Sequence, residues 1–493
     1  MGSTFGSYGI ATSGLRVNQA ALTVVSNNLS NVNTTGYSRQ RISMVETSNG
    51  TSLGMGANVE SITRARNTFL DKTYRNENTD AGYWTVKSGD LEYMQEIVNE
   101  YEYSSDDETT KTSLQTLLED FFDSWSDVAT DPSDQSSREI AVSSAVSLVE
   151  ALSDMDAQLR QLQEDACDRI GEGVDTLNSL AQQVADLNEQ IMAGKINGGE
   201  VSYLEDARDS LIDEMSNYAQ LTVTTYSDGN VTVSIGGINL VNEDKVKELV
   251  VSGTGSVSDP VTISWADTGQ KADISSGTLG AYLEESEQVD LDALDGTDLP
   301  YNFTTGSLSE INTMRQALNT MITTVAVTVN SLCTSGTDLN GDTGIAFFTK
   351  IDDSQPLSIS NIQVNPELLE DDGYQKVVAS SNGSEGDNTI ANAIYALQDE
   401  ELFQFNGTSM NIATFYSTFT SWLGTAADDA NSSYDTQAAL VSSVDSARQE
   451  VSSVSLDEEM ANMVQFQNAY AASARVLSAI DSLIGDMIDQ IGG

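Results

Sequence analysis

Histidine is absent from this sequence of 493 residues, and only two cysteines occur. The chain therefore lacks the commonest general base and the commonest zinc ligand of proteins. The two cysteines, Cys167 and Cys333, lie 166 positions apart in different kinds of sequence. Buried free thiols are expected at both positions, and a disulfide is an open alternative that the spacing does not support.

Long hydrophobic runs are missing, and basic side chains are few. No apolar run approaches the roughly 18 residues of a membrane span, and Met1–Leu15 lacks the basic start and apolar block of a secretory signal. By that test alone the protein would be cytoplasmic. A net charge of −53 disfavours nucleic acids and anionic membranes as partners, because phosphates would be repelled. Residues 1–75 depart from this balance, with seven basic side chains against three acidic ones.

Motifs for catalysis or cofactor binding are missing as well. The sequence has no Gly-x-Ser-x-Gly elbow, P-loop or dinucleotide fingerprint. Residues 338–342, Asp-Leu-Asn-Gly-Asp, open with the oxygen spacing of a calcium loop, but Thr343 and Thr349 stand where glycine and glutamate are required. An Asx/Gly turn is the expected structure there, with a weak cation site as the alternative. We predict no enzyme activity, no cofactor and no metal site.

The C-terminal stretch Leu456–Ile491 has the most regular pattern in the chain. Apolar residues recur there at heptad spacing over about five heptads, which is the a/d pattern of a coiled coil. No proline interrupts the stretch, and Ser455 with Glu458 predicts a capping box at its start. The predicted C-terminal seam consists of Leu456, Met463, Phe466, Tyr470, Leu477, Ile480, Ile484, Met487 and Ile491.

Residues 8–32 show the same period, so the two ends of the chain are predicted to pair. Small residues at Ala11, Gly14, Ala20 and Ala21 would let a partner helix approach closely. Two unrelated amphipathic helices, each docked on a globular core, are the alternative. The predicted N-terminal seam consists of Tyr8, Ala11, Leu15, Leu22, Val25, Leu29 and Val32.

Between its ends the chain is predicted to be mainly α-helical with an inserted β-rich domain. Apolar stripes at i, i+3, i+4 and i+7 predict helices at 66–103, 114–128, 136–193, 203–218, 308–332, 389–401 and 412–451. A break of the third helix at Gly171–Gly173 is left open. After Leu221 the period changes to two, and Asp228-Gly229-Asn230 predicts a hairpin. The expected divisions are a terminal domain of 1–65 with 452–493, a helical domain of 66–219 with 301–451, short strands at 345–366, and a β-rich domain at 220–300.

Several stretches of the sequence match a family pattern. Residues 26–37 read Ser-Asn-Asn-Leu-Ser-Asn-Val-Asn-Thr-Thr-Gly-Tyr, and Ser-Arg-Gln follows. Residues 456–462 read Leu-Asp-Glu-Glu-Met-Ala-Asn. Both stretches resemble the terminal signatures of the bacterial flagellar axial proteins, the rod, hook and hook-associated family. The N-terminal motif is carried by Asn27, Asn28, Asn31, Asn33, Thr34, Gly36, Tyr37, Arg39 and Gln40.

The Ser-Arg-Gln continuation and residues 121–138, 208–237 and 336–348 are similar to the hook-associated members that join hook and filament. The resemblance implies a structural subunit of this junction, exported by the flagellar type III pathway and assembled outside the cell through paired terminal helices. The implied partners are copies of itself, the flagellar hook protein, the next hook-associated protein of the junction and a dedicated export chaperone on the C-terminal region. Another axial subunit, from the hook or the distal rod, is the alternative. A secreted adhesin, a surface-layer protein or an exported hydrolase is a more distant one.

Overall fold

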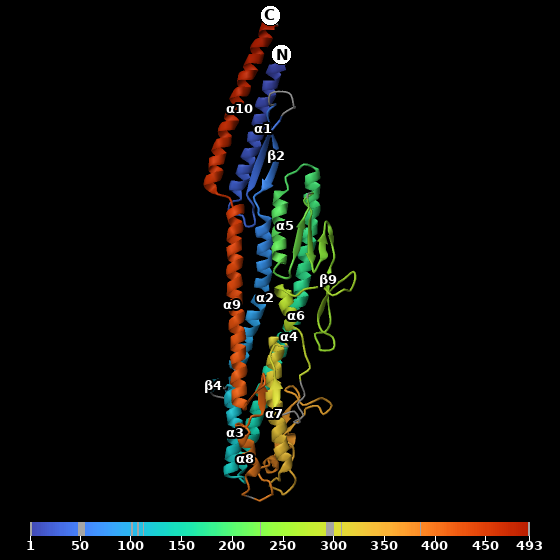
Figure 1. Cartoon of the computed structure of the whole chain (residues 1–493), viewed down its shortest axis with the longest axis vertical. Coiled ribbons are helices and arrows are strands. Elements are labelled where there is room, and N and C mark those ends of the chain that lie inside the picture. The colour runs from blue at the N-terminus through green and yellow to red at the C-terminus, as the bar shows by residue number, and fades with distance from the viewer. Residues whose placement is uncertain are drawn as a thin grey trace.

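A computed structural model shows an elongated molecule in which the two termini lie at the same end (Figure 1). The structure describes residues 2–47, 55–99, 102–105, 108–111, 113–226, 228–291, 300–306, 308–384 and 386–491. Helices run along the long axis, and small sheets lie beside them. The expected fold class, mainly α with a β-rich part in the middle of the chain and packed terminal helices, is confirmed.

The end that holds both termini consists of two helices and a hairpin. Helix α1 (Gly2–Ser30) packs along helix α10 (Leu456–Ile491), and strands β1 (Gln40–Glu46) and β2 (Ala57–Arg64) pair antiparallel beside α1. The hairpin is tied to α1 where the Ala57 amide donates to Ser13 Oγ at 3.2 Å. This part of the molecule projects beyond the rest (Figure 1).

The middle of the molecule is a shaft of long helices. Helix α2 (Thr68–Asn99) packs along α9 (Ile412–Ser452), and α5 (Ser202–Met215) packs on α4 (Gln135–Ile196). Helix α4 is continuous, so the break considered at Gly171–Gly173 does not occur. Gly173 instead serves close packing, because a Cβ there would lie 2.8 Å from Leu279 Cδ2.

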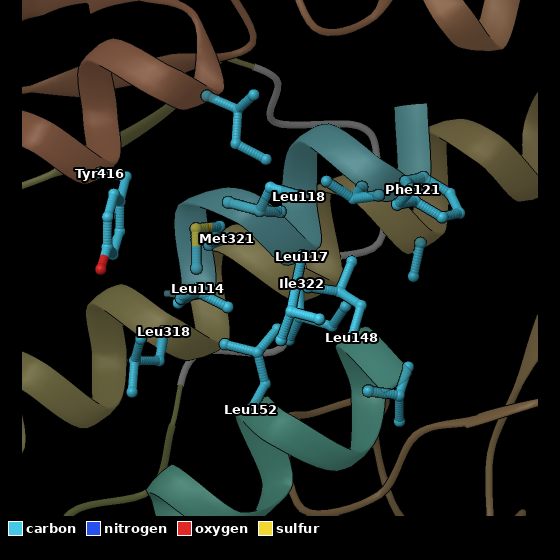
Figure 2. Packing of buried hydrophobic residues seen from close by; sticks show 14 of the residues in the cluster. Leu114, Leu117, Leu118, Phe121, Leu148, Leu152, Leu318, Met321, Ile322 and Tyr416 are labelled. Carbon is cyan, nitrogen blue, oxygen red and sulfur yellow. The ribbon is translucent and has the colours of Figure 1, made fainter. Parts of the chain in front are cut away.

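The far end holds a core rich in leucine and aromatic side chains. Helices α3 (Leu114–Thr130), α7 (Glu310–Ser335) and α8 (Thr389–Ala396) pack there against the first half of α4 and the start of α9. Figure 2 shows leucines of α3 and α4 pointing toward Leu318, Met321 and Ile322 of α7. Ser113 caps α3 by accepting from the Thr116 amide at 3.2 Å. The short elements of this end are β11 (Tyr301–Phe303), β12 (Phe348–Thr349), β13 (Gln363–Val364), η1 (Pro366–Leu368), η2 (Gly373–Lys376), β14 (Phe403–Phe405) and β15 (Thr408–Met410).

The β-rich part packs on the second half of α4 and on α5, and it has a core of its own. Its central strand β6 (Val231–Ile235) pairs with β5 (Thr222–Thr225) through the expected hairpin, where Gly229 adopts a φ of 93°, and with β7 (Ile238–Asn242) through a second turn at Gly236 and Gly237. Buried Val233, Ile235 and Trp265 share this core with Leu177 and Ile212. The elements are β5 (Thr222–Thr225), β6 (Val231–Ile235), β7 (Ile238–Asn242), β8 (Lys245–Val246), β9 (Leu249–Ser252), β10 (Thr262–Trp265) and α6 (Gly277–Glu285).

Some local expectations need correction. Tyr103 does not extend α2 but lies in strand β3 (Glu102–Ser105), which pairs with β4 (Glu108–Lys111). The helix expected at 389–401 ends at Ala396, because the chain then turns into β14. Both cysteines are free, Cys333 buried and Cys167 half-buried. None of the helices that the structure describes combines the length and hydrophobicity needed to cross a bilayer. The domain boundaries stay a prediction.

Candidate functional site

The pairing of the two terminal helices is antiparallel and in a fixed register. Asn28 Nδ2 donates to Glu459 Oε2 at 3.0 Å, near the end of α1 and the start of α10. Fourteen residues further along each helix, a Cβ on Gly14 would lie 3.1 Å from Ser473 Oγ. This glycine allows the close approach that its size predicted.

The centre of the α1 surface is made of smaller residues than the predicted seam. Ala21, Val24 and Val25 are buried, together with Ala11 and Val17. Of the predicted N-terminal seam, Ala11 and Val25 are thus buried, whereas Tyr8 is 43% exposed. Leu15, Leu22, Leu29 and Val32 are half-buried. The leucines of the predicted seam therefore lie along the edge of the helix pair, because the small residues Gly14 and Ala21 allow a close approach that leaves no room for leucine at the centre.

The predicted C-terminal seam divides into a paired and an unpaired part. Ile480 is buried, and Met463, Phe466, Leu477 and Ile484 are half-buried. Leu456 and Met487 are 50% and 41% exposed, because in this register they extend past the two ends of α1. Tyr470 is 39% exposed. Ile491 ends α10, and its side chain lies outside the described residues.

Apolar side chains of α10 are also exposed on the flanks of the predicted seam. We call Met460, Val464, Val476 and Leu483 together the outer face of α10; the first two lie on one flank and the last two on the other, and each keeps more than half of its surface exposed. Apolar side chains exposed on more than one side of a helix are typical of segments that pack against more than one neighbour. Heptad counting did not find these residues.

Asn28, in the middle of the N-terminal motif, donates two hydrogen bonds and accepts two through its side chain. Its side chain is 1% exposed. Its amide donates to the Gln40 carbonyl at 3.0 Å as well as to Glu459, and its oxygen accepts from the Gln40 amide and the Tyr37 hydroxyl, both at 2.9 Å. Asn28 therefore joins α1, the turn that follows it and α10. Loss of this side chain would leave several buried polar groups without partners, at about 1–3 kcal/mol each.

Arg39 provides the charge that holds the start of α10. Its guanidinium lies 2.6 Å from Glu458 Oε2 and 2.7 Å from Glu459 Oε1, and its amide donates to the Ser452 carbonyl at the end of α9 at 2.8 Å. Burial by itself would lower the pKa of Arg39, but hydrogen bonds and ion pairs with the two glutamates raise it. Of the predicted capping box, Ser455 Oγ accepts from the Glu458 amide at a long 3.5 Å, whereas the Glu458 carboxylate turns to Arg39.

The remaining motif residues form the turn between α1 and β1. The Asn31 amide group donates to the Asn27 carbonyl at 2.9 Å, and Thr34 Oγ1 donates to Asn31 Oδ1 at 3.2 Å. Gly36 adopts a φ of 79°, which favours glycine. Burial, with the charge of nearby Asp206, raises the pKa of Tyr37 to about 12. The other two motif residues differ in burial: Asn33 is exposed and Gln40 is buried.

A second network, which sequence reasoning missed, ties this turn to α5. The Ser38 amide donates to Asp206 Oδ2 at 2.9 Å, and Arg64 contacts both Asp206 and Asp209 at 2.8 and 2.7 Å. Burial would raise the pKa of Asp209, but Arg66, Arg64 and Arg75 hold it below its usual value. The acids Glu205, Asp209 and Asp213 are spaced by four and so share one helix face, which is the signal that could have found them.

Arg448 brings α9 into the same network. It lies 2.6 Å from Asp213 and 3.2 Å from Asp71, and its guanidinium carbon is 4.1 Å from the centre of the Tyr74 ring. Arg39, Arg64, Arg66 and Arg75 are thus paired with acids of the same chain, so much of the positive charge of residues 1–75 is neutralised within the molecule. The arrangement is a polar joint between the terminal helices and the shaft.

The geometry gives little support to a cation site at residues 338–342. Asp338 Oδ1 accepts from the Asn340 and Asp342 amides at 2.8 and 2.9 Å, and Gly341 has a φ of 82°, so residues 338–342 form the expected Asx/Gly turn. Within the described ranges, no three or more His, Cys, Asp or Glu side chains are grouped so that they could hold a metal ion.

Three protein-family profiles match the sequence. Residues 106–348 match the helical domain of flagellar hook-associated protein FlgK. Residues 446–490 match the C-terminal part of the flagellar basal body rod FlgEFG proteins, and residues 10–37 match the flagella basal body rod protein family. The two rod profiles fall on the paired terminal helices, and the first falls on the shaft, the β-rich part and the far end.

Known proteins are similar to the chain along its whole length. It is 27% identical to flagellar hook-associated protein 1 of Bacillus subtilis over 525 aligned residues, which span 100% of this chain and 99% of that protein. It is 24% identical to the protein of the same name from Escherichia coli, over 97% of this chain and 98% of that protein. The structure of the flagellar hook junction protein FlgK from Burkholderia pseudomallei has the same fold, with a TM-score of 0.60 at 16% identity, over 78% of this chain and 100% of that one.

Proposed function

Since this chain belongs to the family of flagellar hook-associated protein 1, we propose that it works as the structural subunit that joins the flagellar hook to the filament. The observation that carries this function is the match to curated relatives from end to end, which includes the terminal helices and the helical domain together. Its place is the bacterial flagellum.

We further propose that identical copies assemble through the terminal helices. The outer face of α10 exposes four apolar side chains, and Tyr8 and Ile10 are exposed on α1. Burial of each such side chain against a neighbour contributes about 1.5–3 kcal/mol. Several exposed apolar side chains on one pair of helices are costly in a monomer and useful in a layer of subunits. The hook protein and the next hook-associated protein are the neighbours expected on either side of this layer.

Export before assembly is a second part of the proposal. The chain would leave the cell by the flagellar type III pathway, and a dedicated chaperone would hold the C-terminal region until then. The described part of α10 buries only Glu459 and Ile480 among its side chains, so this helix gains little from its own chain and is easily released. We propose no catalytic activity.

Another axial subunit, from hook or rod, is the alternative, because rod-protein profiles match both ends of the chain. Those profiles cover only the terminal helices, whereas residues 106–348 match the hook-associated helical domain. We therefore prefer the junction subunit.

Removal of the C-terminal helix tests the proposed function. A chain truncated after Val454 should keep a folded shaft and far end, because α10 contributes nothing to either apolar core. Cells with only this form should bear hooks without filaments and should release flagellin into the medium. The full-length chain expressed from the same locus is the control. Normal filaments on cells that carry the truncated chain would overturn the proposal.

A further inference from the structure

Phe69, in the first turn of α2, is exposed where the other phenylalanines are not. It keeps 71% of its surface exposed, whereas each of the other phenylalanine side chains that the structure describes is buried or half-buried. Lys72, one turn further on, is exposed too. Among the described residues Lys72 has no carboxylate within ion-pair distance, although the chain carries 75 acidic residues. Exposed aromatic side chains of this kind are enriched at protein–protein interfaces.

An apolar hollow lies at the same height on the molecule, between α4 and α5. We call it the α4–α5 hollow; its volume is about 680 Å³. The turn at residues 31–37 forms one wall, and no lysine or arginine lines it. Asp186 lines it with an exposed carboxylate, which among the described residues accepts from Gln182 of its own helix alone, at 2.8 Å. The side chains that matter here are Asp186, Leu187, Tyr203, Ala207 and Leu211.

Phe69 and the α4–α5 hollow lie on opposite faces of the chain. A polar cavity next to the hollow shares the turn at 31–37, Asp206 and Ser210 with it, and is lined by Asn67, directly before α2, and by Asp71, Tyr74 and Asn78 of α2. These four residues follow helical spacing and mark the face of α2 on the hollow's side. Phe69 is two residues after Asn67, which places it about 200° around the helix. It cannot reach the hollow of its own chain.

We propose that Phe69 and Lys72 of one copy insert into the α4–α5 hollow of the next copy around the flagellar axis. The ring would pack against Leu187, Tyr203 and Leu211, and the ammonium would pair with Asp186. This inference rests on the proposed function, because it needs copies that stand side by side. It identifies a contact between the shafts of neighbouring copies, in addition to the contact through their terminal helices.

A second copy fits the hollow better than another occupant for two reasons. A projection and a hollow at one height on opposite faces make a heterologous interface, which generates rings or helical arrays by repetition of one rotation. The charges are also complementary: a net charge of −53 makes copies repel in general, and Lys72 against Asp186 is a local attraction that fixes the register.

Charge reversal on the full-length chain tests the pairing. Lys72→Glu and Asp186→Lys should each lower the amount of chain held in isolated hook–filament junctions by about tenfold, because each puts like charges in contact. The double variant should return to within about twofold of the wild type. Lys245→Glu combined with Asp186→Lys is the matched control and should not recover. Failure of the correct double variant to recover would overturn the pairing of Lys72 with Asp186.

A crosslink identifies the occupant. Junctions assembled from equal amounts of ¹⁵N-labelled and unlabelled chain are treated with a carbodiimide, which joins an ammonium and a carboxylate in contact as an amide with loss of water. Mass spectrometry should find a peptide that links Lys72 to Asp186 in mixed-isotope form. A link from Lys72 to the hook protein, or only to its own chain, would overturn the inference.

Phe69→Ala should weaken the same contact, and Ile351→Ala, which removes a side chain at the far end that is 63% exposed, should not. Thermal unfolding of both variants should match the wild type, so a loss of contact cannot be attributed to misfolding. If Phe69→Ala and Lys72→Glu still build complete junctions, this inference fails while the proposed function stands. If the chain truncated after Val454 builds them, the proposed function itself fails.

Discussion

In the far end of the molecule, Trp125, Phe347 and Phe348 are buried, with neighbouring ring centres 5.4 and 5.1 Å apart. In the terminal helices, Met460, Val464 and Leu483 each expose more than half of their surface. The first region satisfies its apolar side chains within one chain, and the second does not. Charge follows the same division. Residues 1–65 and 452–493 hold five basic and eight acidic side chains, a net charge of −3, which leaves −50 for residues 66–451.

This contrast fits the assembly proposed above. The strongly acidic body favours repulsion between copies, and its apolar cores are closed within one chain. The nearly neutral terminal helices can approach one another without that repulsion. The polar joint of Asn28, Arg39 and Glu459 then transmits the position of the terminal helices to the shaft.

The largest stability effect is expected in the far end. Phe347→Ala removes a ring that contacts Trp125 and Phe348 in a packed core, and should lower the free energy of unfolding by about 3–5 kcal/mol. Denaturant unfolding followed by tryptophan fluorescence measures this. Leu456→Ala, at a half-exposed position of α10, is the control and should change little. Equal losses for both would break the contrast between the regions.

Arg39→Ala should act on the joint rather than on the cores. It leaves the Glu459 carboxylate, 2% exposed, without its counter-charge, which costs about 3–5 kcal/mol at a fully buried site and less here. Amide hydrogen exchange should speed up in α1 and α10 but not in α3 or α7. Arg41→Ala, at an exposed position two residues further on in β1, should leave exchange unchanged. Faster exchange throughout would mean that the terminal helices also support the body.

A pH dependence is expected from the shaft, where several carboxyl groups share Lys87. Burial raises the pKa of Glu285 from 4.5 to about 7, although Lys87 opposes this. A raised folded-state pKa gives stability that is complete below 4.5 and is lost as the pH rises through about 7. The free energy of unfolding should therefore fall by about 2–3 kcal/mol across this interval.

Glu285→Gln should remove most of that slope, and a smaller part should stay because burial also raises the pKa of Asp90, to about 6. Glu284→Gln, with a side chain 42% exposed, serves as the control and should keep the slope. Urea unfolding at several pH values gives both results. An unchanged slope in Glu285→Gln would show that another group titrates.

The smallest effect on the monomer is expected at the outer face of α10. Met460→Asp should leave the unfolding of the isolated chain within about 0.5 kcal/mol, because the side chain is 58% exposed. Assembly should nevertheless fail, as seen by hooks without filaments. Leu477→Asp, on the half-buried side, should reduce both the helicity of the terminal region and assembly. If Met460→Asp cells build filaments, the outer face is not an assembly surface.

Much of the fold could be predicted from the sequence, because long amphipathic helices show a regular apolar spacing over many residues. The stripe at 114–128 predicted α3, and the heptads at the C-terminal end predicted α10. The predicted seam residues agree less well with the burial of side chains in the structure. Periodicity assigns bulky residues to a contact, whereas the actual contact centres on Gly14 and Ala21. Leu456 fits the heptads but extends past the end of α1, and Tyr8 is 43% exposed, because register and helix ends are properties of two helices together.

The sequence by itself determined the helical class of the protein and the difference in charge between its nearly neutral ends and its acidic body. These follow from composition and from spacing along one helix, which are local. The motif around Asn28 was singled out by its resemblance to a family pattern. Only the tertiary structure decided that Asn28 and Arg39 meet Glu459, and that Arg64 meets Asp206 and Asp209. Such pairs join residues more than a hundred positions apart, and any of the chain's many carboxylates could have filled those roles until the helices were packed.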